Sequence, residues 1–573
     1  MRKTFSIIIS VLMVLSLCVV GISADDATKV TTSAEFLAMQ ADGNYILDAD
    51  IVVTASYGAG ETPTAFVGTF DGNGHTITVS GAPVFADLGK AVIKNLTIDG
   101  TIESDTNVGA LAASVSANCF DDFTNYAVIE NCVNKASVTM TVPESAEENS
   151  WWGVGGFIGK SADNGGAMFV ECVNEGAITV KCTKTVKIRF YAGGFAGICD
   201  TFLARNCENK ADVQFDGSYD NCLGEDGCAG FVGRVAMTSA FNFCNIEYCV
   251  NNGNVKGARY AGGFLGYAGL SGNTCQYLMD NTPYRFFANI NNGDIEGKFW
   301  AGGIAGYCYC NGTNDAQTFD IEFNLVNGKM TSDQWCSPFV AYSNSTKNIM
   351  MYNVSTAELA KRTAEAKEYM FVFLGCSSSH YPDNTTIQHN YIIDDAGVVK
   401  YLTYATSDDY SKNRIDIAWG IDNNYVTVVT AAQLATGEIA YKINKAAQQN
   451  GFNQTLGTDQ TPTPSLASSY VVQDGNSYKN AATSEFDPLE VLDITTIEET
   501  TKGETTAKAT TAEVTTAAAP TETTAAAPTE TTAAAPTETT AATGKDGGCK
   551  SVIGIGVAIV AVLGAAYVSK KKF

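Results

Sequence analysis

Six copies of one short pattern, Gly-Gly-[Phe/Ile]-x-Gly, constrain the fold of this 573-residue chain more than any other feature. Four copies are complete and two are degenerate, and they begin at Gly109, Gly155, Gly193, Ala229, Gly262 and Gly302. The copies are therefore 33 to 46 residues apart, a spacing inside the range of about 20 to 50 residues that indicates a repeat architecture. We expect one small structural unit per copy, with apolar residues buried by stacking the units.

A second pattern, Cys/Asn-x-Asn-x-Gly/Ala or a close variant of it, follows each copy and completes the repeat. It begins at Cys132, Cys172, Cys207, Cys249, Asn289 and Asn324. Short β-branched runs bounded by Gly and Asn favour strands over helices. Gly and Asn also tolerate the positive φ angle that a sharp corner needs. The two patterns together predict an all-β solenoid in which each coil packs only against its neighbours.

The run Phe66–Ile77 adds a Gly-rich turn, Asp71-Gly72-Asn73-Gly74, between β-forming residues. Together, these motifs are similar to the GLUG-motif repeats of bacterial cell-surface proteins. The likeness covers about residues 28–330. It implies a right-handed parallel β-helix or a related solenoid with an extracellular role, and it brings no catalytic residues with it.

The Asp71–Gly74 turn allows two interpretations. It could be a small calcium loop or place Asp71 and His75 together as a catalytic pair. The simpler alternative is a tight solenoid corner in which Asp71 and Asn73 bind the backbone. We favour the corner, and we expect neither a metal ion nor a cofactor.

Cysteine usage leaves two alternatives open. The chain has 17 Cys, of which Cys18 lies in the leader and Cys549 beside the C-terminal apolar run. The other 15 are odd in number, so they cannot all pair internally. The Cys that open the second pattern share one repeat position, which favours a ladder of buried thiols, whereas export favours disulfides. Zinc is disfavoured because Cys308-x-Cys310 and Cys222-x5-Cys228 lack the usual paired spacing.

Composition along the chain predicts seven segments. These are a signal peptide (1–24), an N-terminal cap with the first coils (25–105), the repeat solenoid (106–345), irregular β coils (346–430), a C-terminal cap region (431–498), a disordered Thr/Ala/Pro-rich stalk (499–548), and an anchor with a basic tail (549–573). The uncharged run 552–568 followed by lysines predicts a single transmembrane helix with the rest of the chain outside.

Local patterns predict the following elements. A short helix over Ser33–Gln40 capped by Ser33 is followed by a strand over Asn44–Thr54, and another strand covers Lys94–Ile98. The apolar spacing of 431–447 predicts one amphipathic helix with Thr430 as its cap.

Charge and motifs exclude several functions. A net charge of −25 repels phosphate backbones and argues against nucleic-acid binding. No nucleophile elbow, phosphate loop or metalloprotease pattern is present. The three histidines (His75, His380 and His389) have no ligand spacing around them. Carbohydrate-active enzymes also occur on β-helices, but fold analogy alone is a weak warrant.

Aromatic residues supply the candidate binding site. Tyr191, Tyr260 and Trp300 each stand two residues before a double glycine, and Trp151-Trp152 lies nearby. They could form a strip that stacks on sugar rings, or a column packed in the core. We therefore expect a non-enzymatic, membrane-anchored surface protein of a Gram-positive bacterium that displays its solenoid for adhesion or for glycan or matrix binding. The alternatives are an extracellular polysaccharide lyase or glycosidase, and a passive structural spacer.

Overall fold

The computed structural model describes residues 27–489 except for short internal segments. These segments are 120–124, 184–186, 219–224, 238–242, 272–283, 312–317, 344–346, 366–371, 377–384, 395–400, 405–414, 417–424 and 465–469. The predicted leader, stalk and membrane segment lie outside the described residues, as does His380. Within the described part of the chain, no helix is long and apolar enough to cross a membrane.

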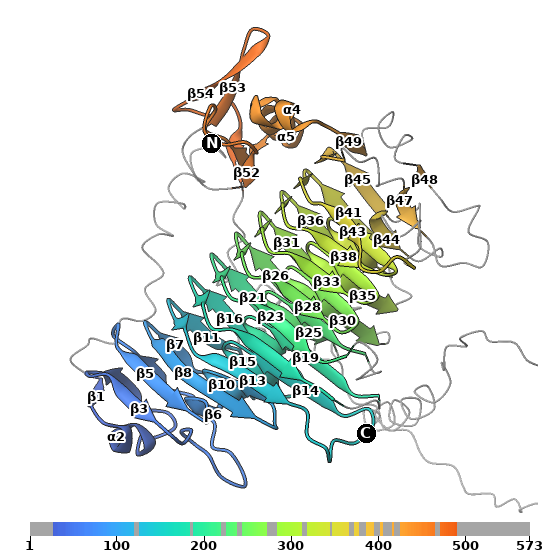
Figure 1. Cartoon of the computed structure of the whole chain (residues 1–573). Helices are drawn as coiled ribbons and strands as arrows, with labels where there is room; N and C mark the ends of the chain where they lie inside the picture. Colours follow the sequence, from blue (N-terminus) through green and yellow to red (C-terminus); the bar gives the residue numbers. More distant parts are fainter. Residues whose placement is uncertain are drawn as a thin grey trace, which may run out of the picture. The chain divides into compact units, whose positions relative to one another are not determined.

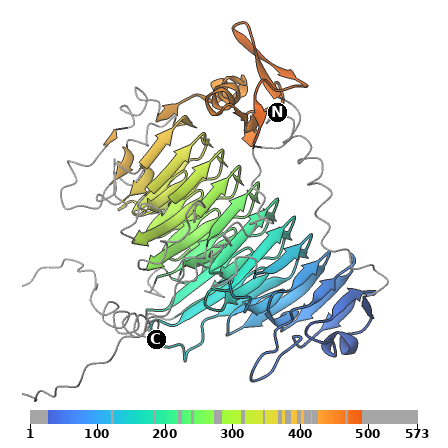
Figure 2. The same ribbon diagram turned by 180° about the vertical axis from the view of Figure 1, so that it is seen from behind.

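The chain winds into a stack of coils whose strands line up in four sheets (Figure 1). A repeat coil passes through sheet A, two short strands of sheet B, then sheet D and sheet C, before it returns to sheet A. Every pairing between successive coils in sheets A, B and D is parallel. Parallel strands usually need a crossover helix, but here the other sheets of the same coil make the return. Figure 2 shows the same succession of coils from behind.

The strands of sheets A and D are as follows. Sheet A contains β1 (Thr28–Val30), β2 (Asn44–Leu47), β4 (Thr69–Asp71), β7 (Val92–Lys94), β11 (Ala127–Glu130), β16 (Gly166–Val170), β21 (Thr201–Arg205), β26 (Cys244–Glu247), β31 (Tyr284–Phe287), β36 (Thr318–Glu322), β41 (Lys347–Met351) and β45 (Thr385–Gln388). Sheet D contains β9 (Val108–Gly109), β14 (Trp151–Gly155), β19 (Arg189–Gly193), β24 (Gly227–Ala229), β29 (Tyr260–Gly262), β34 (Trp300–Gly302) and β39 (Trp335–Ser337).

Sheet B branches after its third strand, because β8 pairs with both strands of the next coil. Its first strands are β3 (Ile51–Val53), β5 (Thr76–Ser80) and β8 (Thr97–Ser104). One column then contains β12 (Val133–Asn134), β17 (Val173–Asn174), β22 (Glu208–Asn209), β27 (Val250–Asn251), β32 (Ile290–Asn291), β37 (Leu325–Val326), β42 (Val354–Ser355), β46 (Asn390–Ile392) and β49 (Val426–Val428). The other contains β13 (Ser137–Thr141), β18 (Ile178–Lys181), β23 (Val213–Asp216), β28 (Val255–Gly257), β33 (Ile295–Gly297), β38 (Met330–Ser332) and β43 (Leu359–Lys361).

Sheet C follows each double-glycine corner. It contains β6 (Phe85–Leu88), β10 (Ala112–Val115), β15 (Ile158–Ser161), β20 (Ala196–Ile198), β25 (Val232–Met237), β30 (Leu265–Ser271), β35 (Ala305–Asn311), β40 (Val340–Ser343), β44 (Val372–Cys376), β47 (Tyr401–Tyr404) and β48 (Ile415–Asp416). Only its last pairing, β47 with β48, is antiparallel. The predicted solenoid is thus confirmed as a stack of long parallel sheets.

The two sequence patterns meet inside the coil and depend on each other. The Asn at the third position of the second pattern forms a fully buried ladder, in which each side-chain amide donates to the next at 2.7–2.8 Å. The ladder runs through Asn134, Asn174, Asn209, Asn251 and Asn291. The second glycine of the Gly-Gly pattern lies against it. A Cβ built on Gly194 would stand 2.5 Å from the Asn209 Oδ1 and 2.2 Å from the Gly230 carbonyl oxygen. Only glycine fits there.

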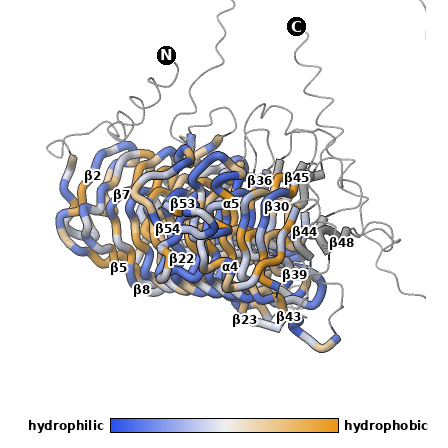
Figure 3. The backbone as a smooth tube through the Cα atoms, turned by 90° about the horizontal axis from the view of Figure 1, so that it is seen from above, coloured by the Kyte–Doolittle hydropathy of each residue, from blue (hydrophilic) through white to orange (hydrophobic). Residues whose placement is uncertain are grey.

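The Phe of the Gly-Gly pattern stacks in the interior. Successive ring centroids of Phe157, Phe195, Phe231 and Phe264 are 5.3, 4.6 and 5.0 Å apart, and all four side chains are fully buried. Figure 3 shows hydrophobic and hydrophilic residues interspersed along the backbone of the coils, as expected when alternate residues point in and out.

A corner between sheets A and B precedes each Cys or Asn of the second pattern. One residue per coil adopts a positive φ of 49–61° there, namely Asn95, Asn131, Glu171, Asn206, Tyr248, Ala288, Phe323, Tyr352 and His389. Asn adopts this left-handed conformation readily, but bulky residues do so at a cost of about 1–2 kcal/mol each. The later coils therefore keep strained residues where the first coils use Asn.

The thiol ladder is confirmed. Cys132, Cys172, Cys207 and Cys249 are free and buried at one repeat position, and the Sγ of Cys207 accepts the Cys172 N–H at 3.4 Å. Burial raises the pKa of Cys132, Cys172 and Cys207. Asn289, Asn324, Asn353 and Asn390 continue the column with amide-to-amide bonds of 2.9–3.1 Å. Disulfide chemistry is also present, because Cys182 is disulfide-bonded.

Several local predictions need correction at the N-terminal end. The first helix is α2 (Ser33–Leu37), and its cap is Thr32, whose side chain accepts the Glu35 N–H while Glu35 reaches back. The strand expected over Asn44–Thr54 is two strands, β2 and β3, in different sheets. The strand expected over Lys94–Ile98 is interrupted by the left-handed corner at Asn95.

The Asp71–Gly74 turn is a corner, as favoured. The Asn73 N–H donates to Asp71 at 2.8 Å and Asn73 has a φ of 51°. His75 lies beside Asp50, with 3.2 Å between its Nδ1 and the carboxylate, and does not pair with Asp71. Among the described residues there is no group of three ligands that could hold a metal ion.

The C-terminal part of the described chain packs on the side of the later coils. The helix predicted over 431–447 is two helices, α4 (Ala431–Ala435) and α5 (Glu438–Ala447), because Gly437 between them has a φ of 83°. Thr430 caps the first helix, as predicted. Short strand pairs follow: β50 (Gln449–Asn450) with β55 (Asp487–Pro488), β51 (Phe452–Asn453) with β52 (Thr463–Pro464), and β53 (Tyr470–Asp474) with β54 (Ser477–Ala481).

An apolar cluster joins this part to the corner column. Leu434, Ile439 and Phe452 share it with Phe287 and Phe323 of the coils. A Cβ built on Gly451 would lie 2.1 Å from the Phe323 ring, so the two parts are in close contact. The bulky left-handed residues of the later coils are therefore the ones that this segment covers.

Candidate binding surface

The five predicted aromatic residues lie along sheet D. Trp151 and Trp152 lie in β14, Tyr191 in β19, Tyr260 in β29 and Trp300 in β34. The register places Tyr260 beside Trp300 and Tyr191 beside Gly153. The structure therefore brings Tyr260 and Trp300 into one column, while Tyr191 lies two coils earlier, beyond Gly227 of β24.

A second aromatic column belongs to the same surface. Tyr267, Tyr307 and Tyr342 are in register in sheet C. Two of them directly follow the last glycine of the pattern, as Gly266-Tyr267 and Gly306-Tyr307. This recurrence is visible in the sequence, but it lies after the double glycine, whereas the predicted aromatic residues all lie before it.

The two columns interleave into one aromatic stack. The Trp300 ring lies 4.8 Å from Tyr260, 4.7 Å from Tyr307 and 4.7 Å from Tyr342, with interplanar angles of 13–18°. Trp335 extends the stack 5.3 Å beyond Trp300. These residues form clusters separate from the main core. The faces of the rings are therefore covered by other rings.

Close approach of the strands explains the stack. A Cβ built on Gly227 of sheet D would stand 2.9 Å from the Tyr267 Cβ of sheet C. Tyr191 points away from the core residues Phe190 and Ala192 on either side of it, yet it is fully buried. Neighbouring rings and arginines cover it instead.

One coil before the first tyrosine of the sheet C column, the same register position is occupied by Arg234. Arg234 follows Ile198 and precedes Tyr267 in the sheet C column. Its guanidinium lies 3.8 Å from the centre of the half-buried Trp151 ring and 5.4 Å from that of Tyr191. Arg189 lies 5.4 Å from the Trp151 ring, and its Nε is 3.6 Å from Glu225. Planar stacking of this kind holds a guanidinium in place while leaving its edge free to donate.

Buried polar atoms are left without partners in this cluster. Within the described residues, the Tyr191 hydroxyl, one oxygen of Asp226 and the Nε of Arg234 make no hydrogen bond. The other Asp226 oxygen accepts the Arg259 N–H at 2.8 Å. Burial raises the pKa of Asp226 to about 7 despite the nearby Arg259. Unpartnered buried groups are costly, and all three of these atoms are shielded from solvent.

We call Trp151, Arg189, Tyr191, Glu225, Asp226 and Arg234 the arginine–aromatic cluster. The chain has only eight arginines, and two of them belong to this cluster while Arg259 stands next to it. Of the five predicted residues, Trp151 has its ring beside the unpartnered groups. Trp152 donates to Ser150 at 2.8 Å and packs against the main core.

A second charged group occupies the outer side of sheet A. Glu247, 1% exposed, accepts from Arg205 at 2.9 Å and also from Arg285. Arg285 lies 3.8 Å from Asp320. Burial, followed by the Asp320 charge, raises the pKa of Glu322 to about 8. No sequence motif marked these residues. Arg205, Glu247 and Arg285 lie on three successive coils, and Asp320 and Glu322 lie two positions apart on the next coil.

Comparisons with known proteins leave the family open. No protein-family model matches the chain, and no curated protein matches it. One solved structure is similar, a provisionally named immunoglobulin A1 protease from Bacteroides ovatus, at 14% identity and a TM-score of 0.34. The match covers 47% of this chain and 76% of that one. A similarity of this size carries no argument about function.

Proposed function

We propose that this chain is a non-enzymatic bacterial surface protein that binds an acidic glycan at the arginine–aromatic cluster. The observation that carries the proposal is the pair of arginines, Arg189 and Arg234, that lie over the half-buried Trp151 ring. Aromatic rings suit the C–H face of a sugar, and arginine suits a carboxylate. A ligand carboxylate would meet the partly exposed Arg189 guanidinium, which lies 5.4 Å from the Trp151 ring.

The wider setting of the proposal comes from the sequence. The leader, the Thr/Ala/Pro-rich stalk and the apolar run 552–568 would export the solenoid and hold it outside the cell membrane. The GLUG likeness, a right-handed coil and the capping roles of α2 and of the C-terminal region belong to the same proposal. A chain with a net charge of −25 would stay soluble and repel polyanions except where arginines gather.

A glycan array probed with the full chain tests the proposal. We expect binding to uronate- or sialate-containing glycans that falls at least ten-fold in Arg189→Gln, because a charge-assisted hydrogen bond contributes about 1.5–3 kcal/mol. Trp151→Ala should lower it further. Val52→Ala, at a 60% exposed apolar position on β3, is the matched control. Binding to no acidic glycan, or equal binding by Arg189→Gln, would refute the proposal.

One observation favours a second candidate, a carbohydrate-active enzyme. Asp320 and Glu322 are two positions apart on one strand, so their side chains lie on the same face of sheet A, as the paired carboxyls of a glycosidase must do. A Glu322 pKa near 8 would keep that carboxyl protonated as an acid at neutral pH. Release of reducing or unsaturated sugar ends from a polysaccharide panel, abolished by Glu322→Gln, would favour the enzyme. Inactivity across the panel would count against it.

A further inference from the structure

One outward-facing residue of each coil contributes to an apolar stripe along sheet B. In the second pattern and its continuation, the residue between the two inward-facing positions points outward, because side chains alternate along a strand. The strand register aligns eight of these residues, which we call the outer stripe. They are Val133, Val173, Glu208, Val250, Ile290, Leu325, Val354 and Tyr391. All but Glu208 are apolar, which is typical of a parallel sheet that is covered on both faces.

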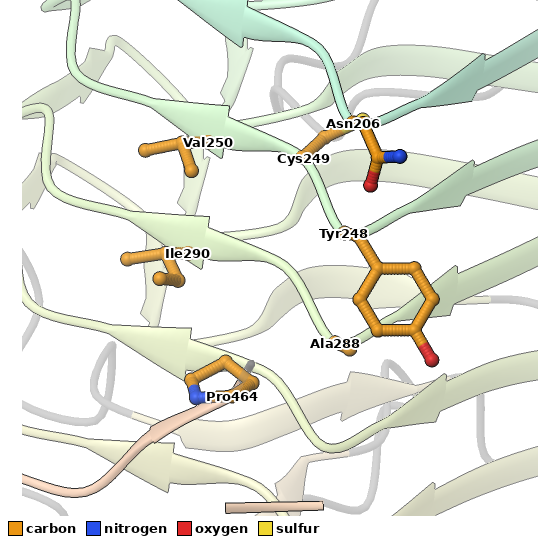
Figure 4. Close-up of a pocket in the computed structure, with 7 residues that line it drawn as sticks. All are labelled: Asn206, Tyr248, Cys249, Val250, Ala288, Ile290 and Pro464. Atoms are coloured by element: carbon orange, nitrogen blue, oxygen red, sulfur yellow. The ribbon is translucent and has the colours of Figure 1, made fainter. Parts of the chain in front are cut away.

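The C-terminal part of the described chain covers the later half of the outer stripe. The last three stripe residues are buried in the apolar cluster that this part forms with the coils, and Ile290 packs against the same cluster. Figure 4 shows Val250 and Ile290 projecting from neighbouring strands, with Pro464 of β52 next in the same line. These three residues line one pocket of about 220 Å³. The covering part therefore reaches as far as the Val250 coil.

The earlier half of the outer stripe is less well covered. Val133, Val173 and Val250 are partly exposed, and within the described residues they belong to none of the apolar clusters. Glu208, the one charged stripe residue, accepts from the Asn252 side chain at 2.6 Å and so is already bonded to the neighbouring coil. Valines that continue in register from a covered interface form a contiguous apolar surface, which marks an interaction site.

The described chain ends beside the covered half of the stripe. Its last strand, β55, pairs with β50. Gly451, directly after β50, lies against the ring of Phe323 at the corner that precedes Leu325. Leu489, which follows β55, is buried in the same cluster. The later stripe residues are already covered there, so the free part of the stripe lies toward the earlier coils.

The next nine residues, 490–498, carry the apolar side chains that a further cover needs. Four of them are large and apolar, namely Val491, Leu492, Ile494 and Ile497. The β-branched residues of this segment favour an extended chain. By contrast, residues 499–548 contain one large apolar residue, Val514. The apolar segment therefore stands between the covering part and the Thr/Ala/Pro-rich stretch.

The length of this segment matches the free part of the stripe. Nine extended residues span about 30 Å, at about 3.3 Å per residue. The register places Val133 five coils before Leu325, a distance of about 24 Å at about 4.8 Å per coil. A chain that leaves Leu489 near the Leu325 coil can therefore pass all three exposed valines before the Thr/Ala/Pro-rich stretch begins.

We propose that residues 490–498 of the same chain lie along the earlier half of the outer stripe and cover Val133, Val173 and Val250. The segment would extend the interface that the C-terminal part already makes with the later coils, and would fasten the earlier coils to it. This docking is independent of the proposed glycan site, because the rings and arginines of the arginine–aromatic cluster belong to sheets C and D.

Photo-crosslinking of the full chain tests the proposal. A benzophenone amino acid replaces Thr495, a polar residue beside Ile494, and mass spectrometry maps the products. We expect crosslinks within one chain to the strands that hold Val133, Val173 or Val250. Val173→Asp puts a charge among the exposed valines and should lower the yield at least five-fold. Ile494→Asp should lower it equally, and it changes no residue of the coils.

Val52→Asp is the matched control, because it makes the same substitution at a 60% exposed position of β3 in the same sheet. It should leave the crosslink yield unchanged. Melting temperatures check the fold of the coil variants, and Ile494→Asp decides the question if Val173→Asp does not fold. Mixing ¹⁴N- and ¹⁵N-labelled chains shows whether crosslinks join two copies. No crosslink to these strands, crosslinks only between copies, or an equal yield in Ile494→Asp would overturn the proposal.

Discussion

Changing Asn209 to Asp alters one atom type in the buried ladder and keeps its shape. The Asn209 Oδ1 accepts from Asn174 at 2.8 Å, and its Nδ2 donates to the Ala211 carbonyl at 2.9 Å and to the Asn251 Oδ1 at 2.8 Å. In Asn209→Asp the acceptor side is preserved. The donor side becomes an oxygen that faces two other oxygens.

The expected loss follows from those two bonds. Each buried group left without its partner costs about 1–3 kcal/mol, so the ionised variant should be about 2–6 kcal/mol less stable. Burial and the facing oxygens should raise the pKa of the new carboxyl above its unfolded value of about 3.9. The pH-dependent part of the loss is therefore complete above the folded pKa and disappears as pH falls toward the unfolded pKa, by about 1.4 kcal/mol per pH unit. Once protonated, the carboxyl can donate to one of the two oxygens again.

Urea unfolding of the full chain at pH 7 and pH 4, followed by circular dichroism, measures this effect. The midpoint should fall clearly at pH 7, and the gap to the wild type should narrow at pH 4. Asn254→Asp is the control, because Asn254 is exposed and its column neighbours are Asp212 and Asp294; we expect a change of about 0.5 kcal/mol or less. An Asn209→Asp midpoint equal to the wild type at pH 7, or a gap that widens at pH 4, would refute the role of the ladder.

Three further predictions concern the corners and buried groups. Gly194→Ala, which places a Cβ against backbone of the next coil, should cost about 1–3 kcal/mol by overpacking, measured by thermal unfolding. Gly60→Ala, where the nearest atom to the new Cβ is 3.7 Å away, should leave the stability unchanged in the same measurement. The buried thiol ladder should not react with a maleimide at pH 8 until urea is added, because burial raises the pKa of Cys172 and blocks access to its thiol. Detection of labelled Cys172 in the native chain by mass spectrometry would contradict this prediction. Asp226→Asn should stabilise the protein at pH 8, because a folded pKa of about 7 makes the ionised, buried carboxylate of Asp226 costly there. The variant should also remove part of the stability that the wild type loses as pH rises from about 4 to 7. A lower melting temperature of the variant than of the wild type at pH 8 would contradict this prediction.

The sequence was sufficient to predict the repeat, but not to predict which residues of the two patterns contact each other. Spacing predicted stacked coils, and the shared position of Cys132 and Cys207 predicted the thiol ladder. The spacing could not show that the second glycine of the Gly-Gly pattern lies against the Asn of the second pattern, because Gly194 and Asn209 come into contact only once the coil has closed. The corner at Asn95 was also missed, since a left-handed residue inside an apolar run looks like a continuous strand.

The candidate sites depended even more on the closed coil. Trp151 was identified from its aromatic neighbour and place before the double glycine, yet its partner Arg234 is 83 residues away in the chain. Residues that serve one site from successive coils are separated by whole repeats, and no local pattern links them.

Isothermal titration calorimetry of the full chain with a tri-uronate oligosaccharide tests the central claim most directly. The proposed acidic-glycan site predicts measurable heat with the wild type and with Val52→Ala, and at least ten-fold weaker binding with Arg234→Gln or Arg189→Gln, with all variants folded at the temperature of the titration. No heat with any chain, or the same affinity in both arginine variants, would contradict it.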